Sequence, residues 1–216
     1  SNLIVVDQNY VVRVPENLDI AGVAPLMCAG ITLYSPLRHW QAGPGKRVGI
    51  IGLGGLGHMG LKFAHAMGAH VTVFSHSEKK KADAQSMGAD EFIANPSEEY
   101  FKKYGNTFDL ILNTVSVDLN LENYLSLLRL DGTLVLIGLP GKPYQVPAGV
   151  LLGKRRRLAG SMIGGIPELQ EMLNFCGEKQ IVSDVEVIDP DYINKAWERT
   201  VASDVKYRFV IDAAKF

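Results

Sequence analysis

The sequence predicts an α/β fold in which helices cover both faces of a doubly wound parallel sheet. Short β-rich runs alternate with helical segments through the middle of the chain. One of these runs ends abruptly in a glycine-rich turn, and the residues after the turn have a helical composition. Because right-handed crossovers between such units leave few other arrangements, the strands are expected to be parallel.

The glycine-rich turn follows the apolar run 48–51 and reads GLGGLG over residues 52–57. Gly52, Gly54 and Gly57 have the G-x-G-x-x-G spacing of a dinucleotide-binding Rossmann crossover. In that motif the first glycine permits a tight turn, the second lets backbone approach a pyrophosphate, and the third lets the helix lie close to the sheet. The helix N-terminus would then attract phosphates. The spacing alone is not specific, so its context must decide the ligand.

The remaining elements repeat this alternation of strand and helix. Further strands are expected at residues 70–74, 91–94, 109–113, 133–137 and 157–161. Helices are expected at 78–87, with Ser77 as N-cap and Gly88 as its stop, and at 98–104 and 119–130. In the helix after Gly165, Cys176 falls on the apolar stripe, where a free cysteine packs as a small hydrophobe.

The two ends of the chain do not follow this alternation of strand and helix. Residues 1–20 alternate apolar and polar positions, which predicts short strands of another domain, and residues 21–40 predict two short helices in series. A strand at 185–188, a helix at 191–201 and a strand at 208–212 are expected to return to that other domain. The predicted domains are therefore 1–21, 22–181 and 182–216, with the nucleotide fold in the middle.

Composition narrows the class of protein. The 216 residues are 47% hydrophobic and 21% charged, with a net charge of -1, which gives no reason to expect nucleic acid or an acidic membrane. No apolar run approaches the roughly 18 residues of a membrane span. The only cysteines, Cys28 and Cys176, form no CxxC pair, which argues against a disulfide scaffold or a complete zinc site. The first residue is Ser1 rather than Met, which indicates a piece of a longer protein.

Other catalytic signatures are absent from the sequence. There is no HExxH, no G-x-S-x-G elbow and no P-loop. His58 and His65 could share a helix face, and a surface or packing role is expected for both. The basic run 154–157 could be a nucleic-acid patch, but a solvated lead-in to the last strand fits a neutral chain better.

The residues after the second strand favour NADP(H) over NAD. A carboxylate usually accepts hydrogen bonds from the ribose 2′-OH at the position that Ser75 occupies here. No Asp or Glu occurs anywhere in residues 20–77, and residues 75–81 read SHSEKKK. Lysines would attract a 2′-phosphate that a carboxylate would repel. The alternative is a capped helix with a solvated basic first turn, although lysines there oppose the helix dipole.

Four stretches match a known family in order and spacing: APLMCAGITLYSPL at 24–37, PGKRVGIIGLGGLGHMGLKFA at 44–64, NTVS at 113–116 and YRFVID at 207–212. Over essentially its whole length the chain resembles the zinc-dependent medium-chain alcohol dehydrogenases, specifically the cinnamyl-alcohol-dehydrogenase-like NADP-dependent branch. The resemblance implies that the flanking segments are remnants of a GroES-like catalytic domain.

The resemblance also implies roles for single residues. Cys28, which the residues alone would present only as a buried thiol, would be a metal ligand of the catalytic zinc, and Thr32 would place a hydroxyl at the nicotinamide. The pyrophosphate would be held by Gly52, Gly54, Gly55 and Leu56, and the 2′-phosphate by Ser75, Ser77 and Lys80. The adenosine and nicotinamide sides would be lined by Thr114, Val115, Gly138, Ser161, Met162 and Ile163. Arg208 aligns less closely with a phosphate-binding arginine.

The implied activity is hydride transfer between NADP(H) and a primary alcohol or aldehyde, whose oxygen a zinc ion polarises as a Lewis acid. One thiolate cannot build a three-ligand zinc site, so the chain alone is expected to be inactive. The resemblance further implies a cytoplasmic homodimer paired through the sixth strand, with no nucleic-acid or membrane partner. Two alternatives stay open: a zinc-free quinone or enoyl reductase of the same superfamily, and a non-catalytic NADPH-binding module.

Overall fold

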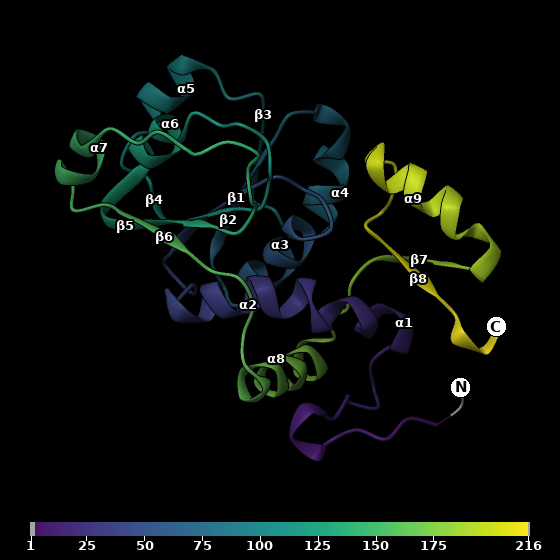
Figure 1. Ribbon diagram of the computed structural model, residues 1–216. Helices are drawn as coiled ribbons and strands as arrows, with labels where there is room; N and C mark the ends of the chain where they lie inside the picture. The colour runs from purple at the N-terminus through teal and green to yellow at the C-terminus, as the bar shows by residue number, and fades with distance from the viewer. Residues whose placement is uncertain (1–2, 216) are drawn as a thin grey trace. The chain divides into compact units, whose positions relative to one another are not determined.

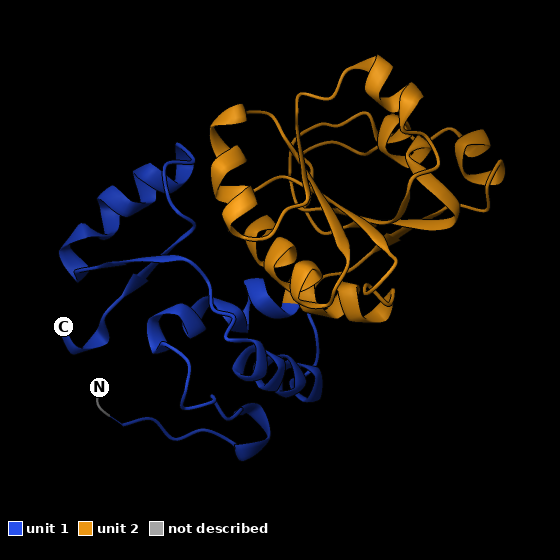
Figure 2. Cartoon of the chain, turned by 180° about the vertical axis from the view of Figure 1, so that it is seen from behind, with its two compact units in different colours: residues 1–31, 163–216 blue, residues 32–162 orange. Residues whose placement is uncertain are grey.

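The computed structural model describes residues 3–215, and the chain divides into two compact units (Figures 1 and 2). Unit 2 comprises Thr32–Met162, and unit 1 comprises Ser1–Ile31 together with Ile163–Phe216. Helix α2 (Ala29–His39) carries the chain from unit 1 into unit 2.

Unit 2 contains a six-stranded parallel sheet in the order β3-β2-β1-β4-β5-β6. Its strands are β1 (Arg47–Ile51), β2 (His70–Ser75), β3 (Glu91–Ala94), β4 (Phe108–Asn113), β5 (Leu128–Leu136) and β6 (Arg157–Gly160). The prediction of a doubly wound Rossmann sheet is confirmed. The strand order reverses between β1 and β4, and ligands of such sheets bind at the carboxyl ends of the strands on either side of the reversal.

Alternate residues of the central strands bury apolar side chains on opposite faces of the sheet. Phe74, Phe108 and Ile111 pack with residues from α5 (Glu98–Lys103) and α6 (Leu121–Ser126). On the other face, a Cβ added at Gly60 of α3 (Gly57–Ala66) would lie 3.0 Å from Leu33 and 3.4 Å from Ile50, which shows how closely this helix packs. Burial on both faces explains why the strands read as short continuous apolar runs.

The helix and strand after β4 differ from the prediction. The helix expected over 119–130 covers only Leu121–Ser126, and β5 already begins at Leu128. Leu128 is fully buried and pairs with Phe108, after which the register shifts so that Leu110 pairs with Thr133. The leucine-rich run is compatible with a helix or a strand. Its last residues form a strand because Leu128 pairs with Phe108 in the sheet.

Short helical segments complete two further crossovers of unit 2, one after β2 and one before β6. The 3-10 turn η3 (Glu78–Lys80) leads into α4 (Lys81–Ser86), and the Ser77 side chain accepts a hydrogen bond from the Lys79 N–H, as expected of an N-cap. Gly88, with φ +100°, follows the helix. Helix α7 (Ala148–Leu152) precedes β6.

The basic run before β6 is less solvated than predicted. Arg156 is half-buried and donates hydrogen bonds to the carbonyl oxygens of Leu128 (2.7 Å), Val150 (3.0 Å) and Ser126 (3.1 Å). Burial lowers the pKa of its guanidinium. Arg156 therefore ties the end of α6, the start of β5 and α7 together, whereas the neighbouring basic residues are exposed.

Unit 1 begins without the predicted strands. Residues 3–19 contain the 3-10 turn η1 (Gln8–Tyr10) but no strand, so the expectation for residues 1–20 is wrong within the described residues; residues 1–2 lie outside them. The side chains of Leu3 and Val5, which belong to the predicted alternation, are exposed, as is Ile4 between them. The segment is instead held to helix α8 (Ile166–Lys179) by polar contacts, including Arg13 N to Gln170 Oε1 at 2.7 Å.

The rest of unit 1 agrees with the sequence. Helix α1 (Ile20–Val23) and the 3-10 turn η2 (Ala24–Met27) precede α2, and Cys176 of α8 is fully buried as predicted. Burial raises the pKa of its thiol to about 12. The chain then forms β7 (Val185–Ile188), η4 (Pro190–Tyr192), α9 (Ile193–Val201), β8 (Arg208–Ile211) and η5 (Ala213–Lys215).

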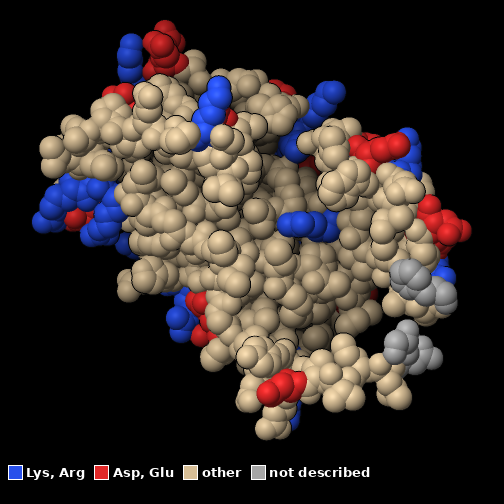
Figure 3. Space-filling view, viewed as in Figure 1, with Lys and Arg blue, Asp and Glu red and all other residues tan. Residues whose placement is uncertain are grey.

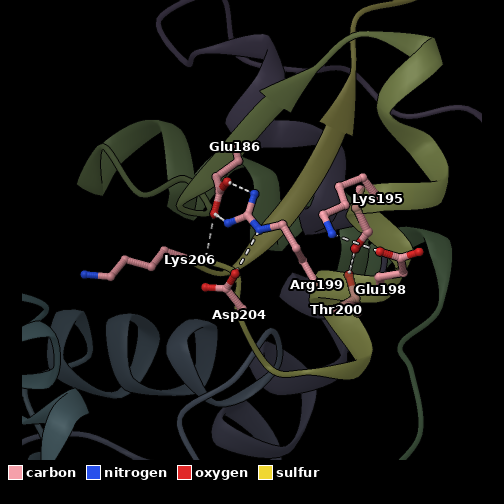
Figure 4. Close-up of polar contacts among 8 residues, drawn as sticks. Glu186, Lys195, Glu198, Arg199, Thr200, Asp204 and Lys206 are labelled. Atoms are coloured by element: carbon pink, nitrogen blue, oxygen red, sulfur yellow. Dashed lines mark hydrogen bonds and ion pairs between the residues drawn. The ribbon is translucent and has the colours of Figure 1, made fainter.

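A polar cluster holds the β7, α9 and β8 elements together (Figure 4). Arg199 donates two hydrogen bonds to the Glu186 carboxylate, at 2.7 and 3.1 Å, and a third to Asp204 at 3.1 Å. The backbone N–H of Lys206 also donates to Glu186, at 3.2 Å. The Arg199 guanidinium lies 4.9 Å from the centroid of the Phe209 ring. One arginine thus links both strands of the small parallel sheet to the helix between them.

Within the described residues, no single helix is long and apolar enough to cross a membrane. The segments Ile20–Met27 and Ala29–His39 reach that length and composition only as a bent pair. Leu33 and Leu37 of this pair are fully buried in the core of unit 2.

Candidate functional site

The glycine turn lies at the topological reversal of the sheet, directly after β1. Gly52 has φ +91°, and its N–H donates to the Phe74 carbonyl at 2.8 Å. A Cβ added at Gly52 would lie 2.3 Å from Cγ1 of Val115, which follows the carboxyl end of β4. Both the left-handed backbone and the close contact require glycine here.

The third glycine lets helix α3 begin against the turn itself. A Cβ added at Gly57 would lie 1.9 Å from the Gly52 carbonyl oxygen. The His58 N–H then donates to the Gly54 carbonyl at 3.0 Å. In the described part of the chain no side chain caps the start of this helix, whose dipole therefore favours an anion.

Gly54 supplies the open approach that a dinucleotide needs. Apart from its two chain neighbours, no described residue has an atom within 4 Å of a Cβ built on Gly54, so ligand phosphates have an open approach to the backbone. Gly55 and Leu56 complete the turn before the helix. The closed contacts at Gly52 and Gly57 and the open face at Gly54 fit the pyrophosphate of a dinucleotide cofactor.

The residues after β2 are connected to this turn. The Ser75 hydroxyl donates to the Ser77 carbonyl and accepts from the Ser77 N–H, both at 3.2 Å. Lys80 Nζ donates to the Leu53 carbonyl at 2.8 Å. Burial lowers the pKa of Lys80, and the nearby Asp83 opposes that shift. The structure therefore brings Lys80, one of the predicted 2′-phosphate residues, into contact with the glycine turn.

Asn113, which was not among the predicted site residues, organises the other side of the reversal. It is fully buried at the end of β4, where its Oδ1 accepts from the Val115 N–H (3.2 Å) and its carbonyl accepts from the Gly138 N–H (3.0 Å). Its Nδ2 donates to the Tyr144 hydroxyl at 3.2 Å. A polar residue ending an apolar strand was the available sequence signal.

Thr114 and Gly138 are held just as closely. The Thr114 hydroxyl donates to the Ile51 carbonyl at 2.8 Å, which links the ends of β4 and β1. A Cβ added at Gly138 would lie 2.0 Å from the Val115 carbonyl oxygen, so no side chain fits at that position. The loops that follow β1, β4 and β5 are therefore in direct contact with one another.

The remaining predicted residues are divided between the units. Thr32, Ser161 and Met162 belong to unit 2, where Thr32 is buried on α2 and Met162 is exposed. Cys28, Ile163 and Arg208 belong to unit 1, and Arg208 starts β8.

Cys28 differs from its expected burial. The residue is exposed. It follows the 3-10 turn η2, where its N–H donates to the Pro25 carbonyl at 3.2 Å. Among residues 3–215, no three His, Cys, Asp or Glu side chains are grouped as a metal site. These residues therefore do not by themselves fit a catalytic zinc ion, which needs three protein ligands.

The two histidines of α3 have the packing and surface roles expected for them. His58 is fully buried, with Nδ1 lying 3.2 Å from the Gly54 carbonyl oxygen. His65 is exposed near the end of the helix. The buried His58 ring therefore contacts the glycine turn through the Gly54 carbonyl oxygen.

The family follows from a direct comparison. The sequence model of the family described as "zinc-binding dehydrogenase" matches residues 55–178, more than half of the chain. The chain belongs to this family. It is 60% identical over 99% of its length to the NADP-dependent alcohol dehydrogenase C 1 of Mycolicibacterium smegmatis, and 55% identical over 98% to the aldehyde reductase YahK of Escherichia coli. The chain spans 61% of the length of each of these relatives.

Solved structures agree with this assignment. A cinnamyl alcohol dehydrogenase of Sorghum bicolor matches with a TM-score of 0.93 at 44% identity, covering 97% of this chain and 60% of that one. The Helicobacter pylori enzyme complexed with NADP(H) matches with a TM-score of 0.88 at 41% identity, covering 98% and 60%. The predicted resemblance to the cinnamyl-alcohol-dehydrogenase-like, NADP-dependent branch is confirmed.

Proposed function

We propose that this chain is the NADP(H)-binding part of a zinc-dependent alcohol dehydrogenase or aldehyde reductase that acts on a primary alcohol or aldehyde. The hydrogen bond from Lys80 to the Leu53 carbonyl is the observation that carries the cofactor assignment. It puts an ammonium group beside the glycine turn, in a segment where Ser75 replaces the usual carboxylate. The names of the relatives, which include NADP-dependent alcohol dehydrogenases and an aldehyde reductase, support the same assignment.

In this proposal each group of residues has one task. Gly52, Gly54, Gly55 and Leu56 hold the pyrophosphate through backbone N–H groups, and Ser75, Ser77 and Lys80 hold the 2′-phosphate. Bound NADP(H) accepts or supplies the hydride. Residues 22–181 form the nucleotide domain, residues 1–21 and 182–216 belong to the catalytic domain, and the remaining cofactor contacts come from Thr32, Thr114, Val115, Gly138, Ser161, Met162, Ile163 and Arg208.

Binding of the two cofactors to the purified chain tests this assignment. NADPH is expected to bind at least about tenfold more tightly than NADH, since hydrogen bonds to charged groups contribute about 1.5–3 kcal/mol. Lys80→Met should reduce this preference, whereas Lys79→Met, a change of equal charge at an exposed neighbour, should keep it. Because Lys80 also holds the Leu53 carbonyl, the ratio of the two affinities is the informative quantity. Equal binding of NADH and NADPH by the unchanged chain would refute the proposal.

The zinc part of the proposal concerns the whole protein. Its support is the family assignment and the exposed thiol of Cys28, which is accessible to a metal. Since residues 3–215 group no further ligands, the 216-residue chain alone should neither retain stoichiometric zinc nor reduce aldehydes with NADPH. Metal analysis and an NADPH-oxidation assay check both points, and sustained turnover would favour the zinc-free reductase alternative.

The cytoplasmic location and the homodimer also belong to this proposal. Light scattering would give the oligomeric state, and cell fractionation would give the location. NADPH binding without any activity in a protein that also includes the part of its relatives' length that this chain does not span would favour the silent nucleotide-binding module.

A further inference from the structure

A polar pocket lies at the opposite edge of the unit 2 sheet from the glycine turn. It has a volume of about 440 Å³ and is lined by the residue before β1 and by residues near the amino ends of β4, β5 and β6. Its charged and aromatic lining includes Lys46, Asp109, Arg129, Asp131, Arg157 and Trp40. The strands are parallel, so their amino ends lie away from the carboxyl ends that carry the predicted cofactor site.

The pocket has more positive than negative charge. The Asp109 carboxylate accepts from the Arg47 N–H at 2.9 Å and forms ion pairs with Lys46 (3.4 Å) and Arg129. Asp109 is almost buried, whereas its two cationic partners are well exposed. One carboxylate therefore balances two cations on this side of the pocket.

On the other side, the Asp131 carboxylate lies beside one lining cation, Arg157, and is also bound by Arg155, which does not line the pocket. Arg155 binds Asp131 with both a 2.9 Å and a 2.5 Å hydrogen bond, while Arg157 Nη2 lies 3.9 Å from that carboxylate. Arg157 Nη1 donates to the Asp131 carbonyl at 3.2 Å, and its side chain is 58% exposed. A guanidinium has five N–H donors, so Arg157 keeps the capacity to bind a second oxyanion. Figure 3 shows Lys and Arg side chains gathered beside α7 and the start of β6, with acidic atoms among them.

We propose that this pocket binds a small phosphate-bearing anion. Arg129, Arg157 and Lys46 line it, and guanidinium groups suit phosphate oxygens because they offer paired donors. The lining has three cations, Lys46, Arg129 and Arg157, and two carboxylates, Asp109 and Asp131, and this surplus of positive charge favours an anionic ligand. This site is independent of the proposed hydride chemistry and of the glycine turn.

Trp40 provides a local signal for the test. It lines the pocket, and the only other tryptophan, Trp197, is exposed in unit 1. In a Trp197→Phe background, pyrophosphate should change the Trp40 emission saturably, and sodium chloride at matched ionic strength should not. Arg157→Gln should weaken the apparent affinity at least about fivefold. Lys46→Gln provides a second variant if Arg157→Gln disturbs folding.

Two control variants distinguish binding in this pocket from binding elsewhere on the chain. Lys154→Gln removes the same charge from an exposed neighbour that does not line the pocket, and it should bind pyrophosphate normally. Lys80→Met should also leave this binding unchanged, because Lys80 lies at the glycine turn. The proposal is overturned if emission does not saturate, if chloride has the same effect, if Lys154→Gln weakens binding as much as Arg157→Gln, or if only Lys80→Met weakens it.

Discussion

The six-stranded sheet of unit 2 and the two-stranded sheet of unit 1 are both parallel, but they are stabilised differently. Central strands of unit 2 are almost completely buried, and Phe74, Phe108 and Ile111 share one apolar core. Strands β7 and β8 are only partly buried. The small sheet relies on the polar cluster around Arg199 instead (Figure 4).

Exposure of apolar side chains shows the same contrast. Ile193, Trp197 and Val201 follow one another at four-residue spacing along α9, and all are more than half exposed. In unit 2 the large side chains of the central strands are inside. Substitutions in the two units should therefore differ in size and in their dependence on pH.

The largest effect is expected in the apolar core. Phe108→Ala should destabilise unit 2 by about 3–5 kcal/mol, since it leaves a cavity beside Phe74, whose ring centroid lies 5.6 Å away. Trp197→Ala in unit 1 should change stability by less than about 0.5 kcal/mol, because that ring is 73% exposed. Urea unfolding followed by circular dichroism measures both. Similar losses for the two variants would remove the contrast between the units.

Next in size is the contact between the glycine turn and α3. Gly57→Ala places a methyl group on the Gly52 carbonyl and should cost about 3 kcal/mol or more, together with cofactor binding. Gly54→Ala meets no atom of the described residues, its two chain neighbours aside, within 4 Å, so the fold should persist. If Gly54 faces the pyrophosphate, this variant should still lose NADPH affinity. Thermal unfolding and NADPH titration separate the two effects, and a stable, cofactor-binding Gly57→Ala protein would contradict the packing argument.

Sequence patterns predicted unit 2 better than unit 1 for a physical reason. A strand buried on both faces is continuously apolar, as residues 48–51 are. A crossover helix begins at a capping residue, as at Ser77. The alternation in residues 1–20 has no such constraint, because exposed Leu3 and Val5 carry the same pattern as half-buried strand residues. The helix expected over 119–130 is present but ends early, at Ser126, because leucines are compatible with helix or strand and Leu128 pairs with Phe108 in the sheet.

For the candidate site, the sequence supplied residue types but not their connections. The spacing of Gly52, Gly54 and Gly57 and the missing carboxylate at Ser75 were visible directly. The bond from Lys80 to Leu53 spans 27 positions, and the role of Asn113 depends on loops that follow two different strands. Contacts of that kind are set by topology, which no local pattern encodes.

A smaller loss of stability than those expected for Phe108→Ala and Gly57→Ala sharpens the comparison through its pH dependence. Hydrogen bonds from Arg199, reinforced by the Lys206 N–H, lower the pKa of Glu186 below its usual 4.5. Because the folded-state pKa is depressed, the stabilisation is present above about pH 4.5 and is lost as the pH falls through the folded-state value. Glu186→Gln should therefore destabilise unit 1 by about 1 kcal/mol at neutral pH, a value reduced for solvent screening. The difference from the unchanged chain should shrink towards acid.

Trp197 reports on unit 1 and Trp40 on unit 2, so variants that keep one tryptophan can follow each unit separately. In the Trp40→Phe background, Glu186→Gln should lower the unfolding midpoint at pH 7 more than at pH 4. Glu198→Gln is the matched control, because it removes an equal charge from an exposed pair with Lys195 on the same helix and should change the midpoint little. A Glu186→Gln effect that does not vary with pH would show that packing by Arg199 over Phe209, rather than its carboxylate partner, holds the small sheet together.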